Sequence, residues 1–66
     1  MRLKINGEWR ELDEVSTAAE LLERLGIQPE TVGVMVNGLV LTRDGLGASP
    51  VADGDEVEIV RFVGGG

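Results

Sequence analysis

The segment TAAELLERLG, residues 17–26, predicts one amphipathic α-helix. Thr17 and Glu20 have the spacing of a capping box, in which the threonine caps the helix and the glutamate reaches back. Apolar side chains recur at the spacing of one helical face: Ala18, Leu21, Leu22 and Leu25. Glu20 and Arg24 are spaced as a favourable i,i+4 pair on the other side. Gly26 ends the helix, and Pro29 prevents its continuation.

The segment before the helix predicts a β-hairpin. Residues 2–5 alternate polar and apolar, which is the period of a half-buried strand. Asn6-Gly7 is the strongest short hairpin signal, and the chain returns through residues 8–12. In this second strand Trp9 and Leu12 have opposite parity, so both cannot face the core without a bulge. We expect Leu12 to be buried and Trp9 to be partly exposed.

The segment after the helix predicts further strands. Residues 32–36 alternate so that three valines point inward and Met35 points outward. Asn37-Gly38 makes a second tight turn into residues 39–41. Residues 42–50 indicate an irregular connection with a short helical turn. The final strand begins at residue 56 and places Val57 and Ile59 on the core.

This order of elements predicts an α+β fold in which one main helix packs across one face of a mixed sheet. We expect the first and last strands to be parallel neighbours at the centre of that sheet. A chain of 66 residues allows one domain, which we place at residues 1–63, followed by a flexible glycine tail at residues 64–66.

Composition excludes several classes of function. Twelve acidic residues against six basic ones leave a net charge of −6, so we expect no nucleic-acid partner. The chain lacks cysteine and histidine, the best nucleophile and the commonest general base, so we expect no enzyme activity and no metal site of its own. Asp53 and Asp55 are better explained by a β-turn than by a calcium loop. Without a spanning segment or a signal peptide, we expect no membrane partner and a cytoplasmic location.

Two features remain for function. The chain stops on Gly64-Gly65-Gly66, and glycines without Cβ atoms can pass a narrow enzyme channel, although such an end can also be a frayed terminus. Three extended residues reach roughly 10 Å. Met35, Val60 and Phe62 are expected on the outer face of the sheet beside this tail, where an apolar patch would serve partner docking. Scattered exposed apolar side chains are the ordinary alternative.

Taken together, these features resemble the ThiS family of ubiquitin-like sulfur carriers over nearly the whole chain. The matching segments are Asn6-Gly7-Glu8, the helix at 17–25 with Leu21-Leu22, Val36-Asn37-Gly38, Asp53-Gly54-Asp55, and residues 57–60 leading to the glycine end. The resemblance implies a β-grasp, ubiquitin-like fold. It also implies that Met35 and Val60 occupy the apolar recognition face of that fold.

The resemblance implies a mechanism at the C-terminus. A ThiF-type activating enzyme would adenylate the carboxylate of Gly66 with ATP and magnesium, so this chain itself would bind no cofactor. A persulfide enzyme would supply sulfur for a thiocarboxylate, and a ThiG-type thiazole synthase of the thiamin pathway would accept it. Gly65 and Gly64 would thread the partner's active site.

The chain departs from the family pattern at two positions. Leu39 replaces a residue that is polar in many members, and Leu46 replaces a bulkier one. These changes leave the carrier role intact but place the contacts with a particular synthase in question. The acceptor also stays open between thiazole synthesis and MoaD-like supply of molybdopterin, cysteine synthesis or tRNA thiolation. A passive ubiquitin-like interaction module is the alternative from a different class.

Overall fold

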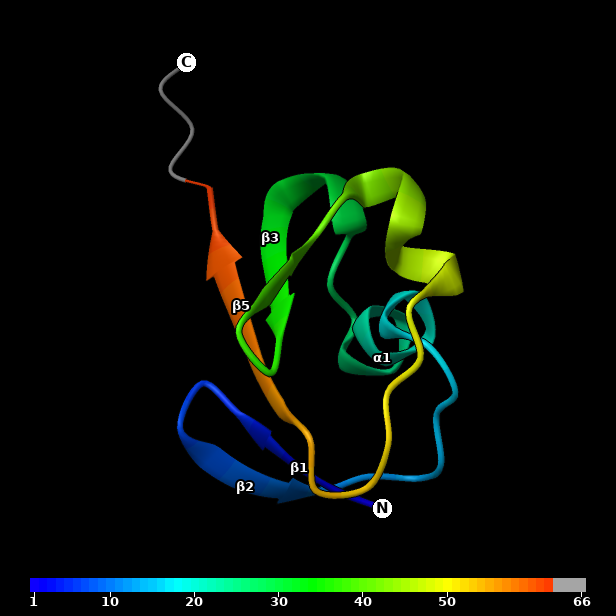
Figure 1. Cartoon of the computed structure of the whole chain (residues 1–66), viewed down its shortest axis with the longest axis vertical. Coiled ribbons are helices and arrows are strands. Elements are labelled where there is room, and N and C mark those ends of the chain that lie inside the picture. The colour runs from blue at the N-terminus through cyan, green and yellow to red at the C-terminus, as the bar shows by residue number, and fades with distance from the viewer. Residues whose placement is uncertain (63–66) are drawn as a thin grey trace.

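The computed structural model describes residues 1–62, which form a five-stranded sheet with one α-helix across one face (Figure 1). The strands and helix are β1 (Arg2–Ile5), β2 (Glu8–Glu11), α1 (Ala18–Leu25), β3 (Val32–Val36), β4 (Leu39–Leu41) and β5 (Glu56–Arg61). Two 3-10 helices complete the elements: η1 (Pro29–Thr31) and η2 (Arg43–Ala48).

The sheet has the strand order β2-β1-β5-β3-β4. β1 and β5 are parallel neighbours, and the other three pairs are antiparallel. β5 therefore lies at the centre, as expected, although it is the last strand in the sequence. This mixed sheet with a single crossing helix is a β-grasp, ubiquitin-like fold, which confirms the predicted class.

Helix α1 begins and ends as its sequence predicts. The Thr17 Oγ1 accepts a hydrogen bond from the Glu20 N–H at 3.2 Å, and Gly26 takes the left-handed conformation at φ 73°. The expected Glu20–Arg24 pair was wrong. The Glu20 carboxylate accepts from the Ser16 N–H at the helix start, and Arg24 instead pairs with Asp13 at 3.7 Å. Glu20 thus stabilises the N-terminus of α1, and Arg24 is directed elsewhere.

The two hairpins turn on the same dipeptide. Asn6 and Asn37 adopt positive φ angles of 50° and 51°, and the glycine after each has a φ of 84°. Asparagine tolerates this left-handed region and glycine adopts it freely, so each turn closes in two residues. A two-residue turn fixes which strand residues face each other, and it places Trp9 opposite Lys4. Trp9 is 51% exposed, as the strand parity predicted. The Arg2 guanidinium lies over its ring, 4.7 Å from the ring centroid.

The core lies between the sheet and α1. Its buried side chains come from the sheet, from α1, from η2 and from the connecting segments: Leu3, Ile5, Val15, Ala18, Leu21, Leu22, Val32, Val34, Leu46, Val51 and Val57. Leu12 and Ile59 are half-buried against this cluster. Leu12 follows the last residue of β2 rather than belonging to the strand, which removes the parity conflict with Trp9. Within the described chain, no helix is long and apolar enough to cross a membrane.

Candidate functional site

The candidate site is the end of β5, from which the chain continues toward its C-terminus (Figure 1). Phe62 is the last described residue, and its N–H donates to the Thr31 carbonyl at 3.0 Å. The domain boundary predicted at Val63 and the tail residues Gly64, Gly65 and Gly66 lie outside the described residues. The hydrogen bond to Thr31, in the segment before β3, therefore holds the backbone in place up to Phe62, one residue before the expected domain boundary.

Both hairpin turns hold β5 through their asparagine side chains. The Asn6 Oδ1 accepts from the Ile59 N–H at 2.8 Å, and the Asn6 Nδ2 donates to the Ile59 carbonyl at 3.2 Å. The Asn37 Oδ1 accepts from the Glu56 N–H at 2.9 Å. Each side chain replaces a backbone partner where the neighbouring strand has already turned away. The strand that leads to the tail is thus held from both sides along most of its length.

Apolar side chains gather on the outer face of the sheet, away from α1. We define the apolar patch as Met35, Val40, Val60 and Phe62. Register places Val60 opposite Gly33, and Met35 opposite Val40 on its other side. Val40, Val60 and Phe62 are 70%, 55% and 59% exposed, whereas Met35 is half-buried. Contiguous exposed apolar groups of this kind mark surfaces that bind other proteins.

Gly33 forms the floor of this patch. A Cβ atom at Gly33 would lie 3.5 Å from the nearest atom of the Phe62 ring. The ring therefore lies over the backbone of β3 rather than extending freely into solvent. A small residue at this position leaves room for the Phe62 ring over β3, and a Cβ there would be in ordinary contact with the ring, whereas a larger side chain would need the space of the ring. Phe62 thereby joins the patch to the last described residue of the chain.

The patch contains the three predicted docking residues and one that sequence reasoning missed. Met35, Val60 and Phe62 share the predicted outer face, although Met35 is less exposed than we expected. Val40 is the addition. The signal was available, because a two-residue turn at Asn37-Gly38 sets Val40 opposite Met35. Whether any of these residues contacts a partner stays a prediction.

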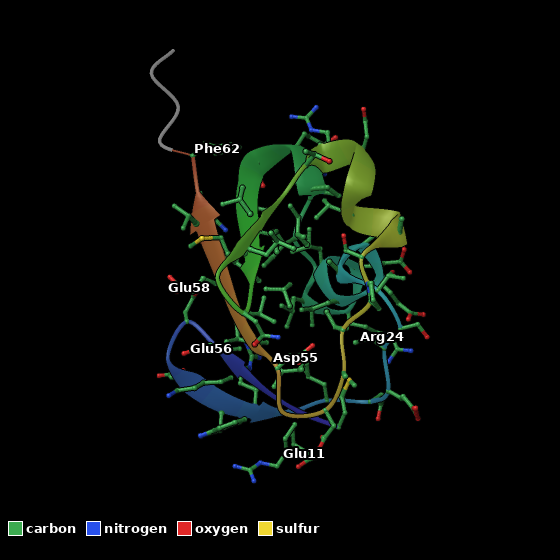
Figure 2. All side chains as sticks on the ribbon, viewed as in Figure 1. Glu11, Arg24, Asp55, Glu56, Glu58 and Phe62 are labelled. Carbon is green, nitrogen blue, oxygen red and sulfur yellow. The ribbon has the colours of Figure 1, made fainter. Side chains whose placement is uncertain are left out.

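Acidic side chains border the apolar patch along β5. Glu58 lies opposite Met35, and Glu56 precedes it on the same outer face. Figure 2 shows Glu56 and Glu58 on the side of β5 away from α1, and Phe62 at the end of the strand. A carboxylate border around apolar groups favours approach by a basic protein surface. The part of the outer face beside Met35 therefore combines apolar contact with the negative charge of Glu58, whereas Lys4 lies opposite Glu56 on β1.

The described side chains offer few groups for chemistry of their own. Among residues 1–62, no three acidic side chains gather in a way that could hold a metal ion. The Asp53–Asp55 segment forms a turn, in which the Asp55 carboxylate accepts from the Ala52 N–H at 2.8 Å and from the Asn37 Nδ2 at 3.1 Å. The Asp53 Oδ1 accepts from the Arg2 N–H at 2.6 Å, so both aspartates take part in hydrogen bonds that hold the turn and its neighbours.

Comparison with known proteins supports the family resemblance found in the sequence. The model of the ThiS family matches residues 3–66. A sulfur carrier protein ThiS of Thermus thermophilus is 37% identical over 62 residues, which cover 94% of this chain and 95% of that protein. A thiazole synthase of Magnetococcus marinus is 38% identical over all 66 residues, so the chain spans about a fifth (20%) of that relative's length.

A solved structure supports the fold directly. The crystal structure of a thiamine biosynthesis protein (ThiS) from Geobacter metallireducens superposes on this chain with a TM-score of 0.84. The two chains are 42% identical, and the match covers 100% of each. The match therefore supports the same overall fold for the two chains.

Proposed function

Since this chain belongs to the ThiS family, we propose that it is a sulfur carrier whose reactive group is the C-terminal carboxylate of Gly66. The observation that carries the proposal is the match to the sulfur carrier protein of T. thermophilus over nearly the full length of both chains. The fold adds a physical reason, because its central strand ends beside an exposed apolar patch and leads toward three glycines.

The first step is activation of the carboxylate. The Gly66 oxygen attacks the α-phosphorus of ATP on a ThiF-type enzyme, pyrophosphate leaves, and an acyl-adenylate results. A carboxylate is a poor electrophile, whereas its adenylate carries a good leaving group. In this scheme ATP is a substrate of the partner, and the partner also binds the magnesium ion that accompanies it. This chain contributes the reacting group and a tail at Gly64 and Gly65 without side chains that would obstruct the channel.

The second step exchanges oxygen for sulfur. The terminal sulfur of a donor protein's persulfide attacks the acyl carbon, and AMP leaves. A thiol then attacks the sulfur of the donor, which cleaves the S–S bond by disulfide exchange. The carrier keeps a thiocarboxylate on Gly66, and the donor keeps a disulfide with the attacking thiol. Atoms and electrons balance, because the thiol supplies the two electrons.

The apolar patch binds the activating enzyme in this proposal. The patch includes Phe62, the residue that precedes the predicted boundary and tail in the sequence, so one partner can contact both. Docking on Val40 and Val60 would orient the tail before it enters the active site, which reduces the entropy lost in reaching the reactive geometry. Catalysis lies entirely in the partner, and the carrier supplies recognition and reach.

We propose thiazole synthesis as the destination of the sulfur. The relative in M. marinus is named a thiazole synthase, and one fifth of its length corresponds to the whole of this chain. A carrier-like segment within a synthase polypeptide is expected where carrier and synthase act together, because covalent linkage raises their effective concentration. This favours a ThiG-type synthase over a molybdopterin acceptor.

Reconstitution tests the proposal. The full chain is incubated with a ThiF-type enzyme, ATP, magnesium, a persulfide donor and a thiol, and its intact mass is followed. We expect the gain that corresponds to replacing one oxygen by sulfur. The chain lacking Gly65 and Gly66 keeps every described residue and should gain nothing. If the full chain also stays unmodified with enzymes that modify another ThiS protein, the passive interaction module is the correct function.

A further inference from the structure

We infer that a groove on the helix side of the molecule, lined by Arg10, Arg24 and Arg61, binds an acidic segment of a protein partner. These arginines come from β2, α1 and β5, so three elements far apart in the sequence meet at one site. The groove has a volume of about 470 Å³. It lies on the face of the sheet opposite the apolar patch, and the inference does not rest on the chemistry proposed at Gly66.

The concentration of positive charge is unusual for this chain. Only six basic residues stand against twelve acidic ones in the whole sequence. Three of the six line this one groove, and none of the residues from 1 to 62 that line it is acidic. Scattered solubility charges would not segregate in this way. The groove is therefore a positive site on a negative protein, where an anionic ligand is attracted locally.

Two of the arginines have no internal partner in the described chain. Within residues 1–62, Arg10 and Arg61 form no salt bridge, and Arg24 pairs with Asp13 at 3.7 Å. The Asp13 side chain is 95% exposed, so this pair is weak and can exchange for another carboxylate. All three guanidinium groups remain available for a ligand.

The floor of the groove is apolar. It is formed by partly buried side chains at the open edge between α1 and the sheet: Leu12, Leu25, Ile27 and Ile59. Guanidinium groups above an apolar floor fit a segment that carries both carboxylates and an aliphatic side chain. Arginine is well suited to this role because its planar group binds carboxylates in a bidentate way and still packs on apolar surface.

The apolar floor, rather than the helix end, favours a peptide over a free phosphate, because the partial negative charge at the C-terminus of α1 opposes any anion. Leu25 is the last residue of α1, so the groove faces the C-terminal end, whose carbonyl groups carry partial negative charge. Phosphate sites are commonly built at the opposite helix end, where N–H groups point at the anion. Figure 2 shows Arg24 on the helix side of the molecule, whereas Glu56 and Glu58 lie on the other side of β5. One partner segment can thus occupy the groove while the outer face stays free.

Titration of the isotope-labelled full chain by NMR tests this inference. The probe is a blocked peptide with four glutamates around two leucines, and a matched peptide carries glutamines instead. We expect saturable shifts at Leu25, Ile27 and Ile59 with the first peptide, weakened strongly by added salt. Absence of saturable shifts at millimolar peptide overturns the inference. Equal shifts with inorganic pyrophosphate would replace it by a small-anion site.

Variants locate the binding. Arg10→Gln and Arg61→Gln should each weaken peptide binding about three- to fivefold, as expected for loss of one exposed ion pair. The double variant should weaken it by about tenfold or more. Arg43→Gln removes the same charge from η2, outside the groove, and should leave the affinity unchanged. Equal weakening by all three single variants would show general charge attraction and contradict a built site.

Discussion

Asn6 and Ile59 exchange two hydrogen bonds although they lie 53 positions apart in the sequence. The side-chain amide of Asn6, in the first hairpin turn, thereby forms the two hydrogen bonds that a residue of a neighbouring strand would otherwise form with β5. β1 pairs with β5 only through Lys4 and Ile5. Without the Asn6 side chain, Ile59 would therefore lack a hydrogen-bond partner on that side of β5. On its β1 side, β5 therefore depends on Asn6 at Ile59, whereas on its other side it pairs with β3 from Val57 to Arg61.

Replacing Asn6 should loosen β5. Asn6→Gly keeps the positive φ of 50° accessible but removes both hydrogen bonds. We expect a loss of about 1–2 kcal/mol in the free energy of unfolding, measured with urea. Hydrogen exchange at the Ile59 N–H should become faster. Asn6→Asp, which keeps the acceptor for that N–H, should restore its protection in part. Unchanged exchange in Asn6→Gly would show that Asn6 does not hold the strand.

Two substitutions at Gly33 should distinguish an effect on the stability of the strand from an effect on the position of the Phe62 ring. Its Cβ position is at ordinary contact distance from the ring, 3.5 Å, so Gly33→Ala fits without displacing it. We expect Gly33→Ala to raise the free energy of unfolding by about 0.5–1 kcal/mol, because glycine is unfavourable within a strand. Gly33→Leu needs the space of the ring and should lower the rate of activation by the ThiF-type enzyme. If both variants are activated like the parent chain, the position of Phe62 does not matter for docking.

Polar substitutions in the apolar patch should slow activation and spare the fold. Val40→Ser and Val60→Ser each remove an exposed apolar side chain, and we expect the kcat/KM of pyrophosphate release to fall about tenfold. Leu39→Ser is the matched control, since Leu39 is 67% exposed but lies opposite Val36 on the other face of the sheet. It should leave kcat/KM unchanged. Equal effects at all three positions would place the docking surface elsewhere.

The helix cap should have an effect on stability alone. Thr17→Ala removes the acceptor of the Glu20 N–H and should lower the free energy of unfolding by about 1 kcal/mol. Thr17→Ser retains a hydroxyl oxygen and should recover most of this loss. Thermal and urea unfolding of the three proteins measure the difference, and activation by the ThiF-type enzyme should be the same for all. A selective loss of activation in Thr17→Ala would implicate the start of α1 in recognition.

Much of the fold was predictable from local signals. The capping pattern at Thr17, the glycine at 26 and the two Asn-Gly turns fix element boundaries through backbone geometry, and the structure confirms them. Parity alone placed Met35 and Val60 on the outer face. These features depend only on neighbours in the sequence, which explains why they could be read from it.

Other features depend on contacts between distant segments. The choice of Asp13 rather than Glu20 as the partner of Arg24 follows from the path of the chain before the helix. The groove of three arginines exists only because β2, α1 and β5 meet at one edge. The contact between Phe62 and Gly33 likewise requires the register of β3 on β5. Spacing along the sequence carries no direct signal for any of these relationships.

The intact mass of the chain purified from its own cells, grown without thiamin, tests whether Gly66 carries sulfur in life. Separation in the presence of a thiol-blocking reagent distinguishes a thiocarboxylate, which reacts, from a carboxylate, which does not. We predict a fraction of the protein heavier by the replacement of one oxygen with sulfur, with the extra mass in the C-terminal peptide that ends at Gly66. Recovery of the C-terminal peptide only as its carboxylate, in cells shown to be making thiamin, would contradict the sulfur-carrier function.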